Sequence, residues 1–295
     1  MKKFYSLLFV ALAVVAMAQM FVSCEKEDFE EPKPEAQIVF TTNKNIGETI
    51  QLAVSLGDEV PEIDGAVVKS VEDWVPYPQM LICELTSQTV TVKGEIKWFW
   101  CNDCGVTSIT ISQHPTLQKL SCNDNLLTTI NVSKNVELRE LSCGGNQLTD
   151  LDVSKNTNLE SLSCSSNPKL TTLNLSNNPN LKVLYCSSNK MKELDVSKNT
   201  KLMHLGCHYN ELTSLDLTNN PKIEYLILMQ NKIKAAEMSK IINTLPDWNG
   251  KESIPWENIL DHGVLYILSG ENGEENEILE EDKKIAEAKN WMIYR

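Results

Sequence analysis

Cysteine and histidine are the residues of this sequence whose spacing suggests specific chemistry. Six cysteines recur at intervals of 21 or 22 residues: Cys101, Cys122, Cys143, Cys164, Cys186 and Cys207. In an exported protein, such a set could form disulfides. Cys101 and Cys104 also have the C-x-x-C spacing of one half of a zinc site.

The regular spacing argues against both uses. Neighbouring in-register strands project their Cβ atoms side by side, a poor geometry for the roughly 90° dihedral of a disulfide. The last repeat carries Leu228 in place of the cysteine, and no second C-x-x-C stands at zinc spacing. We therefore predict that the column packs in the interior as small apolar side chains. Cys83 and Cys104 lie outside this column and could form a disulfide with each other.

The histidines do not form an obvious metal site either. There are four, His114, His204, His208 and His262. His204 and His208 are four residues apart, which on a strand is about 13 Å, too far for one metal ion. The sequence also lacks G-x-S-x-G, H-E-x-x-H and phosphate-loop patterns. We predict no metal, no cofactor and no enzymatic activity.

The cysteines belong to a repeat that covers about half of the chain. Its units begin at Ile96, Leu117, Leu138, Leu159, Leu181, Leu202 and Ile223 and share the pattern L-x-x-L-x-C-x-x-N-x-L. Self-similarity at this period indicates a solenoid. One asparagine row (Asn125, Asn146, Asn167, Asn189, Asn210, Asn231) and a second (Asn135, Asn156, Asn178, Asn199, Asn220) fall where the chain turns corners. We expect both rows to donate to and accept from neighbouring turns.

The units resemble leucine-rich repeats, in particular the LxxLxCxxNxLTxLDVSxN variety of Bacteroidetes-type leucine-rich-repeat surface lipoproteins, with an internalin-like architecture. The resemblance implies a leucine-rich-repeat solenoid with parallel β-strands on its concave face. The alternation in "LTxLDVS" favours an extended or loop-like convex side over a helical one. We expect the repeats to span residues 96–244.

The first residues have the pattern of a lipoprotein export signal. Two lysines precede an apolar run that ends at "VSC", so residues 1–23 are predicted to be a signal peptide and Cys24 the acylated residue. Residues 24–36 are rich in Glu and Pro and are predicted to be an acidic flexible tether. These features predict an exported protein, surface-exposed and lipid-anchored to the outer membrane, whose only membrane contact is this anchor.

Both ends of the solenoid need caps, because an uncapped end exposes apolar surface. Residues 37–95 contain short β-branched or alternating runs such as "QIVFTT" and "QTVTVKG", which predict a β-rich N-terminal cap. Residues 245–295 are predicted to be degenerate repeats that form an α/β C-terminal cap. There, "GVLYIL" and "WMIYR" read as strands and "EEDKKIAEAKN" as a helix.

The concave face is the best candidate for a binding surface, because its outward positions vary most between repeats. The candidate ligand-binding residues are Trp98, Trp100, Lys119, Glu140, Tyr185, His204, His208, Tyr209 and Tyr225. Trp98 and Trp100 could instead simply pack under the N-terminal cap.

Two functions fit such a surface. The first is a non-enzymatic interaction or adhesion module that binds an extracellular protein, and the alternative is a carbohydrate-binding surface lipoprotein that assists glycan capture. Protein binding should depend on charges such as Lys119, Arg139 and Glu140, whereas glycan binding should depend on the aromatic groups. The net charge of −13 disfavours nucleic acid as a partner.

Overall fold

The computed structural model describes residues 36–55, 61–72, 79–111, 114, 116–249, 263–267 and 275–294. These residues all belong to one compact unit, Glu35–Arg295. The predicted signal peptide, the tether up to residue 35, Cys24 and His262 lie outside the described residues. In the described part of the chain, no helix is both long and apolar enough to cross a membrane.

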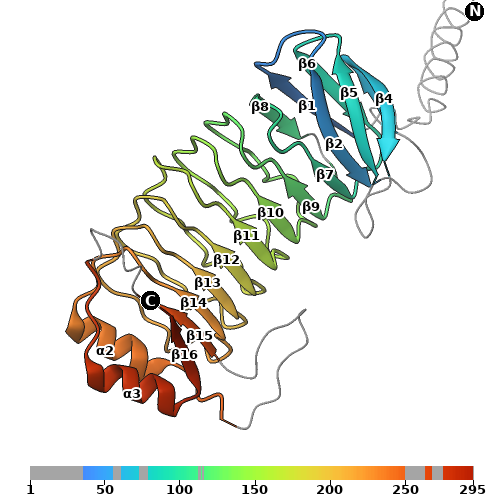
Figure 1. Ribbon diagram of the computed structural model, residues 1–295. Helices are drawn as coiled ribbons and strands as arrows, with labels where there is room; N and C mark the ends of the chain where they lie inside the picture. Colours follow the sequence, from blue (N-terminus) through green and yellow to red (C-terminus); the bar gives the residue numbers. More distant parts are fainter. Residues whose placement is uncertain are drawn as a thin grey trace, which may run out of the picture. The chain divides into compact units, whose positions relative to one another are not determined.

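The described repeats form the predicted solenoid, with one short strand from each turn in a continuous parallel sheet (Figure 1). These strands are β7 (Trp98–Trp100), β9 (Lys119–Ser121), β10 (Glu140–Ser142), β11 (Ser161–Ser163), β12 (Val183–Tyr185), β13 (His204–Gly206), β14 (Tyr225–Ile227), β15 (Gly263–Tyr266) and β16 (Trp291–Tyr294). Each pairs in parallel with the next, and equivalent residues stand side by side, as Leu141 does with Leu162. The connecting segments of the convex side are turns and extended chain, which confirms the predicted fold class.

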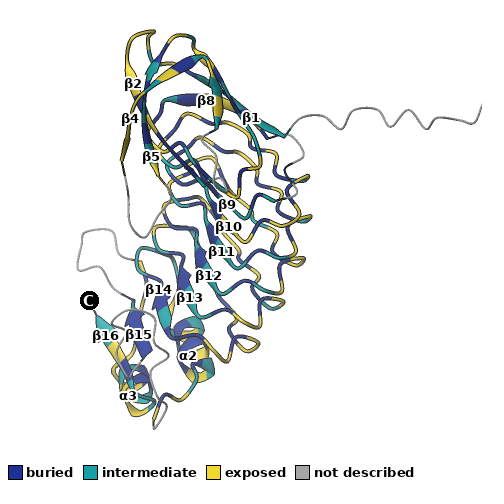
Figure 2. Ribbon diagram, turned by 90° about the vertical axis from the view of Figure 1, so that its right-hand side faces the viewer, coloured by how far each residue is buried: buried dark blue, intermediate teal, exposed yellow. Residues whose placement is uncertain are grey.

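Apolar side chains from successive turns stack into one continuous core. In the turn that begins at Leu159, the side chains of Leu159, Leu162, Cys164 and Leu170 are fully buried. Figure 2 shows buried residues recurring along every turn of the solenoid. Since each turn is too thin to bury its own apolar face, its stability comes from stacking on its neighbours.

The cysteine column lies inside this core. All six cysteines of the column are fully buried free thiols, which confirms their predicted packing role. Burial raises the pKa of the Cys164 and Cys207 thiols to about 12, so these groups are inert at neutral pH. Cys83 and Cys104 are also buried free thiols, and the Cys104 Sγ lies 3.3 Å from the carbonyl oxygen of Gln51.

The first asparagine row behaves as predicted. The Asn146 side-chain amide donates to the carbonyls of Cys122 (2.9 Å) and Cys143 (3.1 Å), while its Oδ1 accepts from the backbone N–H of Leu127 (3.0 Å). Each such side chain therefore ties one turn to the turn before it. Asn276 occupies the same role in the C-terminal cap, donating to the carbonyls of Leu228 and Ile267, although an irregular sequence precedes it.

The second asparagine row corrects the prediction, because its side-chain carbonyls accept no hydrogen bond from the described residues. The Asn156 amide donates to the carbonyls of Val132 (3.0 Å) and Asn135 (2.8 Å), yet its Oδ1 has no donor among the described residues. The same holds for the Oδ1 atoms of Asn178, Asn199 and Asn220. These four side chains reach back to the preceding turn, and no described backbone N–H donates to their Oδ1 atoms. Asn135, the first of the row, makes no side-chain hydrogen bond with the described residues.

His114 stands at the start of this second row. Its carbonyl accepts from the N–H of Leu117 (3.3 Å), as the carbonyl of Asn135 accepts from that of Leu138 (3.1 Å). Its imidazole is completely buried and burial lowers its pKa. His114 is therefore a core residue of the first repeat.

A left-handed turn follows each strand at the same place in every repeat. The third residue after each parallel strand from β7 to β14 has a positive φ: Asp103, Asp124, Gly145, Ser166, Ser188, Tyr209 and Gln230, with values between 51° and 62°. All but Asp103, which precedes Cys104, stand just before a first-row asparagine. Only one of these residues is glycine, although this conformation costs other residues energy. The stacking of the turns therefore imposes the conformation on ordinary side chains.

The N-terminal cap is β-rich, as predicted, and continues the large sheet. The strands β2 (Thr49–Ser55), β5 (Met80–Leu85) and β4 (Ala66–Glu72) extend it beyond β7 in antiparallel order. A second antiparallel sheet contains β3 (Glu62–Asp64), β6 (Thr89–Lys93), β1 (Gln37–Thr42) and β8 (Val106–Ile111). The rings of Phe40 and Phe99 join cap and solenoid, 6.3 Å apart. β8 lies beyond residue 95, so the cap also recruits chain from the first repeat.

Two helices close the other end. α2 (Ala235–Thr244) and α3 (Glu280–Ala288) pack against each other, with Ser239 Oγ 2.7 Å from a carboxylate oxygen of Asp282. They precede β15 and β16 respectively, so each β-strand of the cap has a helix on its convex side (Figure 1). Lys289 Nζ donates to three carbonyls at the end of α2, including that of Leu245 (2.9 Å). The cap is α/β, as the sequence predicts, but α2 ends at Thr244 and so lies before the expected start of the cap at residue 245.

Candidate functional site: the concave face

The outward side chains of the parallel strands form the candidate site. At the first strand residue they are Trp98, Lys119, Glu140, Ser161, Val183, His204 and Tyr225, and two residues later Trp100, Ser121, Ser142, Ser163, Tyr185, Gly206 and Ile227. Because the register has no slip, side chains of the same row lie about 4.8 Å apart. The surface is therefore a fixed two-dimensional array.

At the N-terminal end of the concave face, side chains that were predicted to bind a ligand contact one another instead. Lys119 Nζ lies 4.2 Å from the centroid of the Trp98 ring and 2.7 Å from Glu140 Oε1. The lysine thus forms a cation–π contact and an ion pair at once. Trp98 and Trp100 are both half-buried, and β7 pairs with β2 of the cap.

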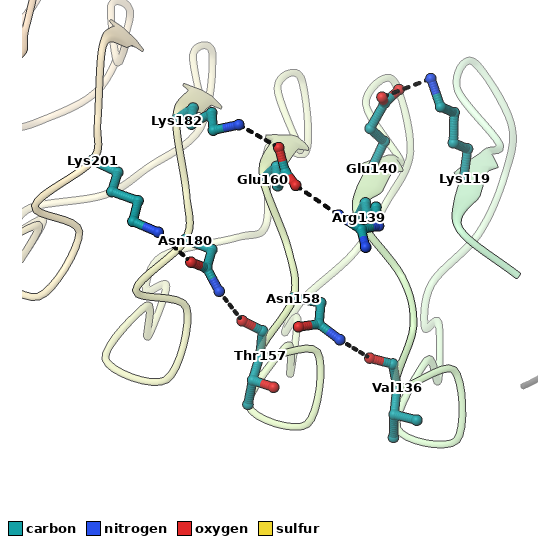
Figure 3. Close-up of polar contacts among 10 residues, drawn as sticks. All are labelled: Lys119, Val136, Arg139, Glu140, Thr157, Asn158, Glu160, Asn180, Lys182 and Lys201. Atoms are coloured by element: carbon teal, nitrogen blue, oxygen red, sulfur yellow. Dashed lines mark hydrogen bonds and ion pairs between the residues drawn. The ribbon is translucent and has the colours of Figure 1, made fainter.

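A second set of charges runs along the edge of the strands. Glu160 accepts from Lys182 Nζ (2.6 Å) and Arg139 Nη1 (2.9 Å), as Figure 3 shows. The hydrogen bond from Lys182 holds the pKa of Glu160 below its usual value, and Arg139 adds to the effect. Because these charged side chains already form ion pairs with one another, fewer charges are available to a binding partner than their number in the sequence suggests.

The two histidines of the concave face contact different neighbours. His204 Nε2 lies 3.0 Å from Oε1 of Glu224, whose side chain is only 7% exposed. The ring of His208 packs edge-on against Tyr209, with centroids 5.5 Å apart, and burial lowers the pKa of His208. No cluster of three metal-ligating residues occurs among the residues that the structure describes.

Tyrosines dominate the C-terminal half of the face. Tyr225 lies beside His204, with ring centroids 5.7 Å apart, and meets Tyr266 edge-on at 6.1 Å. Tyr266 in turn stacks on Tyr294, with centroids 4.8 Å apart and planes inclined by 19°. Burial raises the pKa of Tyr225, and the neighbouring Tyr266 and Tyr185 raise it further.

Sequence reasoning missed Tyr266 and Tyr294, which are the most tightly stacked members of this group. In the sheet, Tyr266 pairs with Ile227 and Tyr294 with Tyr266, so both continue the outward row of Tyr185. A signal was present: "VLY" at 183–185 returns as "VLY" at 264–266 and "MIY" at 292–294. The repeats of the C-terminal cap lack the regular asparagine spacing from which the register of the other repeats can be read.

Gly206 makes room for one of these rings. A Cβ atom at this position would lie 2.7 Å from Cδ1 of Tyr185, closer than atoms in contact can approach. The phenol ring of Tyr185 therefore leans over the next strand, and burial raises its pKa. The site is a set of half-buried rings rather than of mobile side chains.

Comparison with known proteins supports the repeat assignment. The family described as "Leucine Rich repeats (2 copies)" matches residues 136–177. No curated protein sequence matches the chain. The chain thus contains leucine-rich repeats, and the matching family describes a repeat rather than an enzyme.

Solved structures with similar folds come from internalins of Listeria monocytogenes. Internalin C2 is 22% identical, with a TM-score of 0.52, over 68% of this chain and 80% of that chain. The functional domain of InlJ, described as including a cysteine ladder, is 24% identical with a TM-score of 0.49, over 70% of this chain and 50% of that chain. The match to InlJ therefore spans about half of its length, and at these identities the likeness concerns the fold alone.

Proposed function

We propose that this protein is a non-enzymatic interaction module that binds another protein with the C-terminal half of its concave face. The observation that carries the proposal is the group of half-buried rings of Tyr185, Tyr225, Tyr266 and Tyr294. Tyrosine is enriched in protein interfaces because it adds large contact area and a hydroxyl group while losing little conformational entropy. Leucine-rich repeats are typically protein-interaction modules, which agrees with this use.

The packing of the rings favours a protein over a glycan. A sugar-binding platform needs an open aromatic face, but Tyr266 and Tyr294 cover one face of each other at 4.8 Å. Tyr266 also meets Tyr225 edge-on at 6.1 Å, so this ring has aromatic neighbours on two strands and offers a partner little open face. Ring edges and hydroxyls suit the mixed apolar and polar surface of a protein segment.

The direct test is a binding screen of residues 35–295, the compact unit, against paired panels of extracellular proteins and glycans. The comparison is a Tyr185→Ala, Tyr225→Ala, Tyr266→Ala variant. We expect a protein partner whose affinity falls at least about tenfold in the variant, the loss expected for a few interface anchors. A glycan bound with the same dependence on the tyrosines would replace the proposal with carbohydrate capture.

We further propose that the module is exported and held at the outer-membrane surface by a lipid on Cys24. The support is the apolar run that ends at "VSC" and the acidic segment that follows it. Cys24→Ala should abolish partitioning of the full chain into detergent, because one residue would carry the entire anchor. Unchanged partitioning of that variant would rule out the lipid anchor.

A further inference from the structure

A small hollow lies between the charged and the aromatic halves of the concave face. It has a volume of about 130 Å³, and its lining includes Ser161, Val183 and Met203. Ser161 follows Glu140 and precedes Val183 in the same outward row, so a small side chain stands there between larger ones. The hollow is thus a gap left by one serine in an otherwise filled row.

The size of the hollow matches one side chain. A cavity of about 150 Å³ lined by apolar groups binds a benzene molecule. The hollow of about 130 Å³ could hold the ring of a phenylalanine or the branched end of a leucine. It is too small for a sugar chain or a folded element.

The charges around the hollow are already paired within the chain. Glu140 binds Lys119 at 2.7 Å, and Glu160 binds Lys182 at 2.6 Å. His204, the wall on the tyrosine side, is held by Glu224 at 3.0 Å. A charged side chain in the hollow would lose its water without gaining an unpaired partner, whereas an apolar one would meet Val183 and Met203.

We propose that the hollow is an anchor pocket for one uncharged apolar side chain, of leucine or phenylalanine size, from a protein segment that lies across the tyrosines. This inference rests on the proposed function and gives it a specificity determinant. The ion pairs shape the mouth of the pocket and select against charged occupants. The tyrosines next to it bind the rest of the segment.

Methyl NMR of chain labelled at methionine methyl groups provides the test, because Met203 reports on the pocket. The probes are N-acetyl-phenylalaninamide, N-acetyl-leucinamide and N-acetyl-argininamide. We expect the two apolar amides to shift the Met203 resonance saturably, and about tenfold more tightly than the arginine amide, as burial of an isobutyl-sized group implies. Equal or tighter binding of the arginine amide, or no saturable shift, would overturn the pocket assignment.

Two matched substitutions localise the effect. Ser161→Trp should fill the pocket and remove the shift, while Ser142→Trp, on the adjacent strand and outside the lining, should leave it intact. The resonances of the buried Met191 and Met238 show whether each variant is folded. An unchanged Met203 shift in folded Ser161→Trp contradicts the proposal.

The pocket assignment and the proposed function can be refuted independently of each other. Loss of a protein partner in the tyrosine variant without any Met203 shift by the amides would refute the pocket alone. Saturable amide binding in a chain that binds no protein on the panel would leave the pocket and refute the protein-binding function.

Discussion

Single asparagines connect each turn of the solenoid to the next, and the two rows do so with different numbers of hydrogen bonds. Asn189 donates to the carbonyls of Cys164 and Cys186 and accepts from the N–H of Asn167. Asn199, in the same repeat, only donates, to the carbonyls of Leu175 and Asn178. Replacing Asn189 leaves the buried N–H of Asn167 without an acceptor, whereas the two carbonyls keep the amides of Asn167 and Asn210 as donors. Replacing Asn199 leaves no backbone group unsatisfied, because the carbonyls of Leu175 and Asn178 also accept from backbone N–H groups.

We therefore expect Asn189→Ala to cost on the order of 3 kcal/mol and Asn199→Ala about 1–2 kcal/mol less, because the second also removes an unpartnered carbonyl oxygen. Urea unfolding of both variants measures the difference. Since the two positions share a repeat and a residue type, each serves as the control for the other. An equal or larger loss for Asn199→Ala would contradict the distinction between the rows.

The cysteine column predicts instability in alkali. Cys164 and Cys207 have pKa values of about 12 in the folded chain, against 9.0 for an ordinary thiol. Between these values the unfolded chain has lost protons that the folded chain retains, so raising the pH favours unfolding, by about 1.4 kcal/mol per pH unit for each such thiol. Stability is unaffected by these thiols below about pH 9 and falls as the pH rises above it.

Unfolding midpoints measured from pH 7 to 11 test this expectation. Burial raises the pKa of all six thiols in the column. Cys164→Ala removes one of them and should make the fall above pH 9 less steep, at the cost of a small cavity at all pH values. A midpoint curve of Cys164→Ala that runs parallel to that of the unmodified chain would show that ionisation of this thiol is not the cause.

At the scale of the element, the left-handed residue after each strand is where stacking overrides local preference. Ser166 is exposed and has φ of 57°, so its side chain contributes little packing. Ser166→Val should cost about 1–2 kcal/mol, because β-branched residues fit this conformation poorly. Ser166→Gly should retain stability.

Ser163→Val is the matched control, since Ser163 lies on the strand β11 three residues earlier and β-branched residues suit a strand. Thermal unfolding of Ser166→Val, Ser166→Gly and Ser163→Val measures the three changes in stability. Loss of stability in Ser163→Val equal to that in Ser166→Val would mean that the backbone conformation is not responsible.

The elements also show how far the sequence could predict the fold and the site. The periodic leucines, the cysteine column and the first asparagine row fix the register from β9 to β14, so outward residues such as Tyr185 and Tyr225 could be predicted. Tyr266 and Tyr294 leave only the weaker signal of the "VLY" and "MIY" triplets, because insertions separate β15 and β16 from the regular spacing. The pairing of Glu160 with Arg139 and Lys182 depends on side chains from three turns, and no repeat pattern specifies which neighbours meet.

For the whole molecule, the distribution of charge separates the concave face from the rest of the chain. The chain carries a net charge of −13, yet the outward strand residues from Val183 to Tyr294 include no acidic or basic residue apart from His204. An interface built there should depend little on salt, because screening acts on charges and not on apolar contact. The sequence alone had suggested dependence on Lys119, Arg139 and Glu140, which the structure pairs with Glu140, Glu160 and Lys119.

The central claim is that a protein partner binds the tyrosines of the concave face. The most direct measurement compares the affinity of one partner for variants altered on this face and outside it. Dissociation constants are measured for the unmodified chain, the Tyr185→Ala, Tyr225→Ala, Tyr266→Ala variant, and a Thr128→Ala, Thr171→Ala, Thr213→Ala variant altered at exposed positions outside the strands. We predict that the tyrosine variant binds at least about tenfold more weakly while the threonine variant binds as the unmodified chain does. Weakened binding in the threonine variant, with the tyrosine variant unaffected, would place the interface outside the concave face and contradict the account.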